Sequence, residues 1–413
     1  MDCGNQDLVD IDLALGAVLA LARPVADNVM LPVGAALGRV TAADIHTGTA
    51  LPPFDHSAVD GYGITVEDLA AGRDGLRIVA DIAAGHESGR SLDPGETVRL
   101  FTGAPIPVGV AAVLFEERCR RAGGRLAPGG RITLGANIRR RGEDVAAGEV
   151  IVDRGTVIDA RHIALLAAAG VTEVRVARPL HVAVLSNGDE LREPSVSLEP
   201  GTIHDSNRPM LLALLAGPSV EPCDAGLHPD DPGRLADAVA RAAAFADVVF
   251  LSGGASGSDA DHAATAIEAC GGHALRLKLQ LKPGKPVVVG CVDDRPVLGL
   301  PGNPVAAMVN FLLFGRPLLR AMLGAPADRP RGQSAIAAEP IRHAKGRREF
   351  LPARIVGRTA DDRVMLAKLG RGGSARLRPL ALADGLAELP AGRGDCAPGD
   401  PLTFHPFASG LTR

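Results

Sequence analysis

The stretch VVFLSGGASGSDADH, residues 248–262, joins an apolar run to a turn with paired glycines and then to polar residues that can begin a helix. The apolar run predicts a buried strand, and the spacing after the turn predicts a helix over 260–271. Strands and helices of this kind alternate from residue 179 to residue 326. This alternation is typical of a doubly wound α/β domain with a largely parallel sheet.

The flanking regions follow different patterns. Residues 7–22 have apolar side chains at helical spacing, whereas the chain from about 25 to 160 consists mostly of short apolar runs separated by glycine and proline. We therefore expect residues 1–178 to form a helical and β-rich region that includes an inserted β arm at about 45–145. A polar linker, ADRPRGQ, precedes further short apolar runs, so residues 327–413 are expected to form a small C-terminal β domain. The predicted fold class is a multidomain α/β protein.

Composition narrows the range of functions. The 413 residues carry a formal net charge of -4, with 46% hydrophobic and 22% charged residues, so we expect compact domains rather than disorder. A chain with this charge has no overall field that would attract nucleic acid. The six cysteines are widely spaced, the N-terminal residues are acidic, and no apolar run reaches the ~18 residues of a membrane span. We expect a cytoplasmic protein without nucleic-acid or membrane partners.

Three predicted strands end in glycine-bearing turns with polar residues. These turns lie in AVLSNGDEL (183–191), in the stretch 248–262 and in VLGLPGNPVAAM (297–308). Ligands of open parallel sheets bind where strand ends, loops and helix N-termini meet, so one shared pocket is expected. Gly253 and Gly254 allow close backbone approach, and the helix N-terminus favours an anion such as phosphate. A helix cap and a tight turn would explain the second turn alone equally well.

Carboxylates beside these turns indicate a metal-bridged phosphate. Asp259, Asp261 and Glu190 would repel a phosphate unless a divalent cation lay between them. Mg²⁺ prefers one or two carboxylates together with phosphate oxygens, so a Mg²⁺-bound phosphate ester is the expected ligand. Each carboxylate taken alone could equally be a helix cap or a solvated charge.

The stretch LKLQLKPGKPVVVG (277–290) holds three of the five lysines in a chain that otherwise uses arginine. Lysine carries a compact point charge that suits oxoanions. The alternation with leucine predicts a strand on which Lys278 and Lys282 share one face, with Lys285 following. The alternative is a strand with a solvated basic face.

Loops rich in Pro, Gly, Asp and Ser mark the β arm, as in LPPFDHSAVDGYG (51–63). Such loops can present rigid polar groups, although turns alone would explain them equally well. The sequence has no nucleophile elbow, Walker loop or H-E-x-x-H motif. The residues alone therefore predict a multidomain α/β enzyme that handles a phosphorylated ligand with Mg²⁺ and a second oxoanion.

Nine short motifs are spread over nearly the whole chain: LPPFDHSAVDGYG, TGAPIP, RGEDVAAGEVIVDRGT, LSNGDEL, HDSNRPML, SGGASGSDAD, KPGKP, LPGNPVAAM and RREF. In this order and spacing the chain resembles the molybdopterin molybdenumtransferase (molybdenum insertase) family, to which the E domain of gephyrin is related. The resemblance implies an L-shaped homodimer with an active site between the α/β domain of one subunit and the β arm of the other. It implies that adenylylated molybdopterin and molybdate give molybdenum cofactor and AMP by Mg²⁺-dependent cleavage of the phosphoanhydride.

The resemblance also implies three groups of site residues. The first comes from the arm, the second surrounds Mg²⁺ and the phosphoanhydride, and the third binds the pterin nucleotide and molybdate. Within the third group, two of the lysines, Lys278 and Lys282, would also act in catalysis. In that order, the groups are Asp60, Thr102 and Asp144; Glu190, Asp230 and Asp261; and Ser252, Gly253, Gly254, Asp205, Asn207, Lys278, Lys282, Lys285, Pro301, Pro304, Arg347 and Ser374.

The chain departs from the family's usual residues at His56, Asn187, Ser258 and Ala306. Because the carboxylates and lysines are retained, these changes bear on affinity or metal preference more than on reaction type. A molybdopterin adenylyltransferase is the alternative enzyme, but such proteins are short single-domain chains. A non-catalytic molybdopterin-binding scaffold is a third alternative. The resemblance further implies contacts with the adenylyltransferase and with proteins that mature molybdoenzymes.

Overall fold

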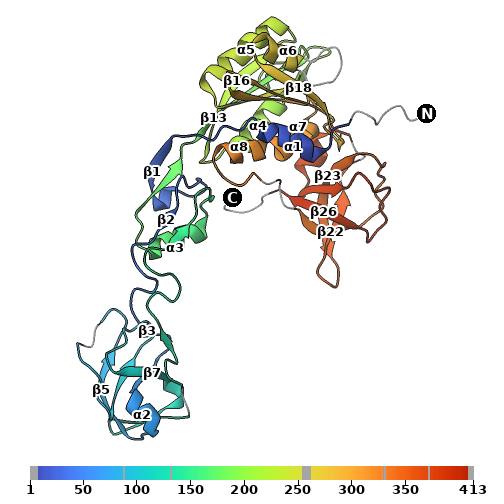
Figure 1. Cartoon of the computed structure of the whole chain (residues 1–413). Helices are drawn as coiled ribbons and strands as arrows, with labels where there is room; N and C mark the ends of the chain where they lie inside the picture. The colour runs from blue at the N-terminus through green and yellow to red at the C-terminus, as the bar shows by residue number, and fades with distance from the viewer. Residues whose placement is uncertain are drawn as a thin grey trace.

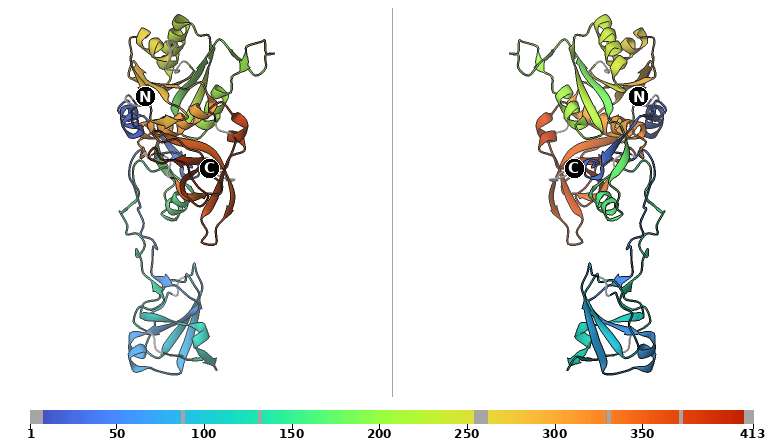
Figure 2. Two further views of the ribbon diagram at one scale, coloured as in Figure 1. Left: turned by 90° about the vertical axis from the view of Figure 1, so that its right-hand side faces the viewer. Right: turned by 90° about the vertical axis from the view of Figure 1, so that its left-hand side faces the viewer.

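The computed structural model describes residues 8–86, 89–130, 133–253, 262–327, 329, 332–370 and 373–407. Figure 1 shows an elongated molecule with two domains side by side at one end and an arm that leads away from them. One of the two is the α/β domain, and the other is a β domain formed by the C-terminal part of the chain. The side views show that the arm ends in a separate β domain (Figure 2).

A six-stranded sheet forms the centre of the α/β domain. Its order is β16 (Val220–His228), β13 (Leu180–Asn187), β17 (Val248–Ser252), β21 (Arg295–Leu300), β20 (Pro286–Val292) and β18 (His273–Lys278). The first four strands are parallel, and β20 runs antiparallel to both of its neighbours. A short parallel pair beside the sheet consists of β14 (Leu191–Arg192) and β15 (Ile203–His204).

Helices cover both faces of this sheet, as the alternation of side chains along β13 shows. Val182 and Val184 pack into one core with α1 (Ile11–Leu19) and α4 (Asn207–Leu215). Ala183 and Leu185 pack into the other core with helices on the opposite face, α5 (Pro232–Phe245) and α6 (His262–Ala269). Because each central strand is buried on both faces, its sequence is a continuous apolar run. The predicted α/β fold class is confirmed, and α1 packs against this domain although it precedes the arm in sequence.

One long helical run crosses the first of these cores. It consists of α7 (Pro304–Asn310), a π-helical segment η3 (Phe311–Gly315) and α8 (Arg316–Met322). The 19 residues from Pro304 to Met322 are long and apolar enough to cross a membrane, but 72% of that apolar window is buried inside the protein. Phe314 packs in the same core as Phe250 of β17. This degree of burial is what a core helix of an α/β domain shows.

A partly buried ion pair links two strands at the amino-terminal edge of the sheet. Two guanidinium nitrogens of Arg178, just before β13, donate to the two carboxylate oxygens of Asp247, just before β17, over 2.7 and 2.8 Å. The backbone N–H of His181 also donates to this carboxylate, over 2.9 Å. Burial raises the pKa of Asp247, but the bonds from Arg178 and His181 outweigh it, so the pKa lies below its usual value.

The arm has two parts. Next to the α/β domain, two antiparallel pairs and α3 (Ala160–Ala168) enclose a small core; the pairs are β1 (Asn28–Pro32) with β12 (Glu173–Ala177), and β2 (Ile45–His46) with β11 (Val150–Val152). A 3₁₀ turn, η1 (Val33–Ala35), belongs to the same part.

The far part of the arm is built on a six-stranded sheet with apolar cores on both faces. The chain enters and leaves it through the pair β3 (His56–Ser57) and β10 (Ile138–Arg139). The sheet order is β7 (Val110–Phe115), β4 (Gly61–Thr65), β6 (Glu96–Leu100), β5 (Leu76–Ile82), β9 (Arg125–Ala127) and β8 (Arg120–Ala122), accompanied by α2 (Val66–Ala71) and η2 (Glu116–Arg118).

The C-terminal domain is a closed β structure. Its strand order is β19 (Leu281–Lys282), β23 (Arg348–Arg358), β24 (Val364–Lys368), β22 (Gln333–Ala337), β26 (Pro401–Pro406) and β25 (Gly385–Leu389), with α9 (Leu377–Ala381) beside them. A further pairing between β23 and β25 closes the sheet into a small barrel.

The prediction of one strand through the lysine-rich stretch is wrong. Strand β18 ends at Lys278 in the α/β sheet, whereas β19 begins at Leu281 and pairs with β23 of the barrel. The backbone N–H of Leu279 donates to the carbonyl of Lys285 over 2.6 Å, so the chain loops out of the α/β sheet between these residues, and β19 lies within the loop. Lys278 and Lys282 therefore belong to strands of different sheets.

Candidate active site

A cavity of about 1020 Å³ is lined by both the α/β domain and the C-terminal barrel. The α/β domain contributes the turns after β13, β17 and β21, and the barrel contributes residues 347, 349–352 and 373–377. The implied site residues that line it are Glu190, Asp205, Asn207, Asp230, Ser252, Gly253, Lys282, Lys285, Pro301, Pro304, Arg347 and Ser374. The structure thus brings most of the second and third predicted groups to one place.

The geometry of the sheet explains this convergence. Strand β17 lies between β13 and β21, and the three are parallel, so their carboxyl ends meet at one edge. Gly253 follows β17 with φ of +102°, and a Cβ at this position would lie 2.2 Å from the backbone oxygen of Asn187. The close packing of two turns therefore requires glycine here, in addition to any contact with a ligand.

Asn207 links the turn after β17 to the turn after β21. Its Nδ2 donates to Ser252 Oγ over 2.8 Å and to the backbone oxygen of Gly302 over 2.7 Å. The side chain stands at the first turn of α4 and is buried. Its Oδ1 has no hydrogen-bond partner among the described residues. Asn207 thus fixes the turns after β17 and β21 relative to each other and leaves one buried acceptor.

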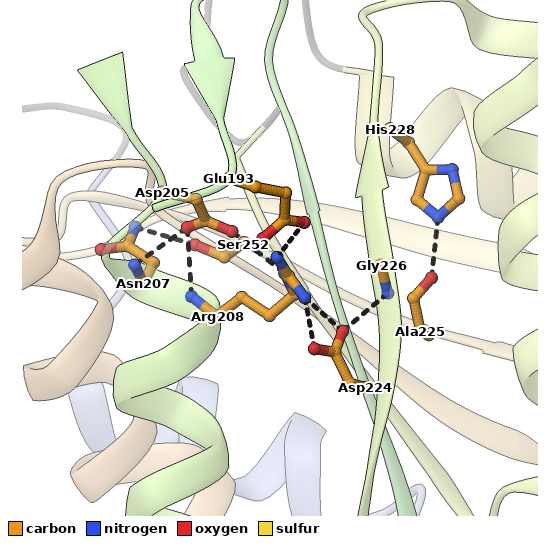
Figure 3. A network of polar contacts seen from close by, with 9 residues as sticks. All are labelled: Glu193, Asp205, Asn207, Arg208, Asp224, Ala225, Gly226, His228 and Ser252. Carbon is orange, nitrogen blue, oxygen red and sulfur yellow. Dashed lines mark hydrogen bonds and ion pairs between the residues drawn. The ribbon is translucent and has the colours of Figure 1, made fainter. Parts of the chain in front are cut away.

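A buried arginine, Arg208, follows Asn207 in the sequence and bonds to three carboxylates (Figure 3). Arg208 donates to Asp205 Oδ2 over 3.1 Å and also bonds to Asp224 and Glu193, so its guanidinium joins three chain segments. Burial lowers the pKa of Arg208, but these three carboxylates outweigh it and raise the pKa overall. Asp205 Oδ1 meanwhile accepts the backbone N–H groups of residues 207 and 208, over 3.0 and 3.2 Å.

This network gives Asp205 a structural role at the edge of the cavity. Both of its carboxylate oxygens are engaged within the protein, and its side chain is 1% exposed. Asp205 therefore caps the start of α4 and positions Asn207, rather than presenting a free oxygen to a ligand.

Two carboxylates at the cavity lack such cationic partners. Among the described residues, neither Glu190 nor Asp230 forms an ion pair; Asp230 Oδ1 accepts from Asn187 Nδ2 over 2.7 Å, and Oδ2 accepts from the Asp189 N–H over 3.3 Å. The Asn187 Oδ1 atom is buried and has no partner within the described chain. No group of three His, Cys, Asp or Glu with metal-ligand geometry occurs in the described ranges. The arrangement nevertheless fits Mg²⁺, which commonly uses one or two carboxylates with substrate phosphates.

Cationic side chains line the barrel side of the cavity. Lys282, Lys285 and Arg347 all line the cavity, and the pairing of β19 with the start of β23 brings their two chain segments side by side. Lys282 Nζ lies 2.9 Å from Glu349 Oε1. Lys278 is exposed and is absent from the lining, so the structure separates it from the other two lysines.

The turn around Pro301 and Pro304 holds the barrel loop in place. The backbone N–H of Val305 donates to the carbonyl of Ser374 over 3.0 Å. Asn310 Nδ2, one helical turn further on, donates to the carbonyl of Ala306 over 2.9 Å. Ser374 and Ala306, one of the positions where the chain departs from the family's usual residues, both line the cavity.

The three implied arm residues lie away from the cavity, and two of them contact each other. Asp60 Oδ1 accepts from the backbone N–H of Thr102 over 2.7 Å and from its hydroxyl over 2.8 Å, and these bonds lower the pKa of Asp60. The backbone N–H of Asp144 donates to Leu51 on the same arm. None of the three lines the cavity, and Figure 1 shows the far arm domain well away from the α/β domain and barrel. Within one chain, the structure does not bring the arm group to the cavity.

Two implied site residues, Gly254 and Asp261, lie outside the described residues. Other residues that line the cavity were missed by sequence reasoning, among them Glu349, His262 and Arg376. Glu349 lies in the motif RREF, which is part of the family resemblance. No sequence pattern, however, indicates that it contacts Lys282. That contact depends on the pairing of β19 with β23.

Comparison with known proteins agrees with this architecture. Residues 9–170 match the profile of the MoeA N-terminal region (domain I and II), residues 183–321 that of a probable molybdopterin binding domain, and residues 334–407 that of the MoeA C-terminal region (domain IV). The molybdopterin molybdenumtransferase 2 of Mycobacterium tuberculosis H37Rv is 33% identical over 383 residues, which cover 91% of this chain and 94% of the relative. The chain belongs to the molybdopterin molybdenumtransferase family.

Other members of the molybdopterin molybdenumtransferase family match over similar lengths. The enzyme of Haemophilus influenzae is 34% identical over 379 residues, which cover 90% of this chain and 92% of that protein. The crystal structure of a molybdopterin biosynthesis moeA protein from Pyrococcus horikoshii OT3 superposes with a TM-score of 0.81 at 28% identity, over 97% of this chain and 100% of that one. The family resemblance drawn from the nine motifs is thereby confirmed.

Proposed function

We propose that this chain transfers molybdenum from molybdate to adenylylated molybdopterin, with cleavage of the phosphoanhydride, release of AMP and formation of molybdenum cofactor. The observation that carries the proposal is a single cavity with carboxylates on the α/β side and cationic groups on the barrel side. A substrate with a pterin, an anhydride and a separate metal dianion needs both kinds of group. Relatives named molybdopterin molybdenumtransferase that align over about nine-tenths of the chain support it.

On the α/β side, Glu190 and Asp230 would hold Mg²⁺ against the anhydride, joined by Asp261. Bound there, Mg²⁺ would neutralise the charge that develops on the phosphate as AMP leaves. The turn after β17 would seat the nucleotide phosphate, because Ser252 and Gly253 lie at the carboxyl edge of the sheet and line the cavity. Asn207 keeps this turn in register with the Pro301–Pro304 turn.

On the barrel side, Lys282, Lys285 and Arg347 would hold molybdate, with Ser374 as a neutral donor. Molybdate is a tetrahedral dianion, and several cationic donors around it supply charge and hydrogen bonds together. The pterin supplies the sulfur ligands, so the protein needs no cysteine cluster for the metal. Lys278 is left out of this group because it lies away from the cavity.

The arm group would act in a second subunit. Asp60 and Thr102 form an ordered polar pair on a domain that lies away from the cavity of its own chain. We infer a homodimer in which these two residues and Asp144 complete the partner's site. In the cytoplasm, an adenylyltransferase would supply the nucleotide and molybdoenzyme maturation proteins would receive the product.

The decisive experiment incubates the purified full-length protein with adenylylated molybdopterin, Mg²⁺ and molybdate. AMP release and pterin-bound molybdenum should appear together and should both require molybdate. Incorporation of AMP from ATP into molybdopterin would instead favour an adenylyltransferase. Tight pterin binding without either product would favour a non-catalytic scaffold.

A further inference from the structure

The cavity contains a cation that is already paired. Lys282 Nζ lies 2.9 Å from Glu349 Oε1, and the register of β19 with β23 places the two residues directly opposite each other. The lysine side chain is 46% exposed toward the cavity, whereas the glutamate side chain is 4% exposed. The mobile partner of this ion pair is therefore the lysine.

Glu349 is fixed from its other side by a buried histidine. His343 Nδ1 lies 2.7 Å from Glu349 Oε2, and the imidazole is 1% exposed. The other ring nitrogen lies 3.3 Å from the carbonyl of Pro390, and the His343 backbone N–H donates to Asp395 Oδ1 over 2.7 Å. The carboxylate thus keeps a hydrogen-bonding partner when Lys282 moves, which lowers the cost of leaving it without the lysine.

This arrangement has an electrostatic consequence for an anion. A dianion that recruits Lys282 must compete with a buried carboxylate for the ammonium group. By ordering the lysine side chain, Glu349 also favours anion binding. This gain is modest, because the Lys282 side chain is nearly half exposed. The net effect of Glu349 is to weaken the hold of Lys282 on an oxyanion.

We propose that Glu349 is a positioning residue that holds Lys282 between oxyanion-binding events and sets the affinity of the site for molybdate. The inference rests on the proposed function, in which Lys282 binds molybdate. The barrel would then also limit the affinity of the site for molybdate. A moderate affinity lets the metal oxyanion leave the lysine for the pterin.

The test is Glu349→Gln in the full-length protein. Glutamine has nearly the same shape and still offers an oxygen to Lys282, but it carries no charge. With adenylylated molybdopterin saturating, the molybdate concentration at half-maximal rate should fall about tenfold, a conservative effect for removing one charge at this range. The half-saturating concentration of adenylylated molybdopterin should stay within about twofold. Glu349→Asp keeps the charge and should remain close to the unaltered protein.

Lys282→Ala separates this inference from the proposed function. If it leaves the molybdate dependence unchanged, the assignment of Lys282 to molybdate is wrong. Suppose that Lys282→Ala raises the half-saturating molybdate concentration, whereas Glu349→Gln raises that concentration or leaves it unchanged. Only the role of Glu349 is then refuted. In a Lys282→Ala background, Glu349→Gln should have less than about a twofold effect; a full effect there would show that Glu349 acts on the oxyanion directly.

A second variant keeps the proposal testable if Glu349→Gln fails to fold. Lys282→Arg retains the charge and can pair with Glu349 through two parallel bonds, so it should be held more firmly than lysine. Its half-saturating molybdate concentration should rise several-fold, with little change for the pterin nucleotide. An unchanged or lower value would overturn the inference.

Discussion

Replacing Asn207 with alanine should loosen two of the turns that line the cavity. The amide Nδ2 is the donor to Ser252 Oγ, at 2.8 Å, and to the carbonyl of Gly302, at 2.7 Å. Each buried acceptor left without a donor costs about 1–3 kcal/mol. The substitution also removes the unpartnered Oδ1, which offsets part of this loss. We expect the free energy of unfolding of the α/β domain to fall by about 2–4 kcal/mol.

Calorimetry of the full-length protein measures this effect. For a domain of this size, each kcal/mol shifts the midpoint by roughly 3 °C, so the α/β transition should move down by about 6–12 °C. The half-saturating concentration of adenylylated molybdopterin should rise more than that of molybdate, because the displaced turns lie on the nucleotide side. Ser206→Ala is the matched control, since the Ser206 side chain makes no capping bond at the same helix start.

If Asn207→Ala melts within about 1 °C of the Ser206→Ala control, the Nδ2 bonds do not stabilise the two turns. Asn207→Asp gives a second check, because it keeps the shape of the side chain and exchanges the donor group for an acceptor. An aspartate there would place an oxygen against the carbonyl of Gly302, so it should destabilise the domain at least as much as alanine. A well-tolerated aspartate would show that the Nδ2 bonds do not hold the turns.

Three further predictions concern the ion pair, the lysines and the arm. Because Asp247 has a lowered pKa in the folded protein, it stabilises the fold above its unfolded pKa of about 3.9, and this contribution is lost as pH falls through the folded value. Asp247→Asn should therefore lower stability by roughly 3 kcal/mol at pH 7 and flatten the acid limb of a denaturation curve, whereas the 81% exposed Asp27 should tolerate the same change. Lys278→Ala should leave the molybdate dependence of the rate within about twofold, while Lys282→Ala should shift it by tenfold or more, and equal effects would contradict the separation of the two lysines. At a molybdate concentration too low for the Lys282→Ala chain to turn over appreciably, coexpressed Asp60→Asn and Lys282→Ala chains should recover about a quarter of the normal rate if the arm acts across a dimer, and a rate no higher than that of the separate variants would refute that arrangement.

The cavity edge could be predicted from sequence because it depends on local pattern. Strands β13, β17 and β21 are apolar runs, and each is followed by a glycine-bearing turn. Once the alternating pattern indicates a parallel sheet, the carboxyl ends of neighbouring strands must meet at one edge. The requirement for glycine at position 253 also follows from this geometry, since the Asn187 backbone leaves no room for a side chain.

The contacts between domains could not be predicted in this way. The alternation of leucine and lysine over 277–282 is the pattern of one strand, yet the chain leaves the α/β sheet after Lys278 and joins the barrel at Leu281. That switch depends on β23, which lies in another domain and far along the sequence. No local period of side chains contains this information, so Lys278 was grouped with Lys282 and the partner Glu349 was overlooked.

The carboxylates around the cavity divide according to their cationic partners, which only the folded structure reveals. Asp205 and Glu349 are buried. Arg208 neutralises the charge of Asp205, and Lys282 neutralises that of Glu349. Glu190 and Asp230 have no ion pair within the described part of the chain. Carboxylates without a cationic partner, at the edge where the strand ends meet, leave negative charge that a divalent cation can neutralise. The free carboxylates, Glu190 and Asp230, are therefore the ones that we expect to hold the cation.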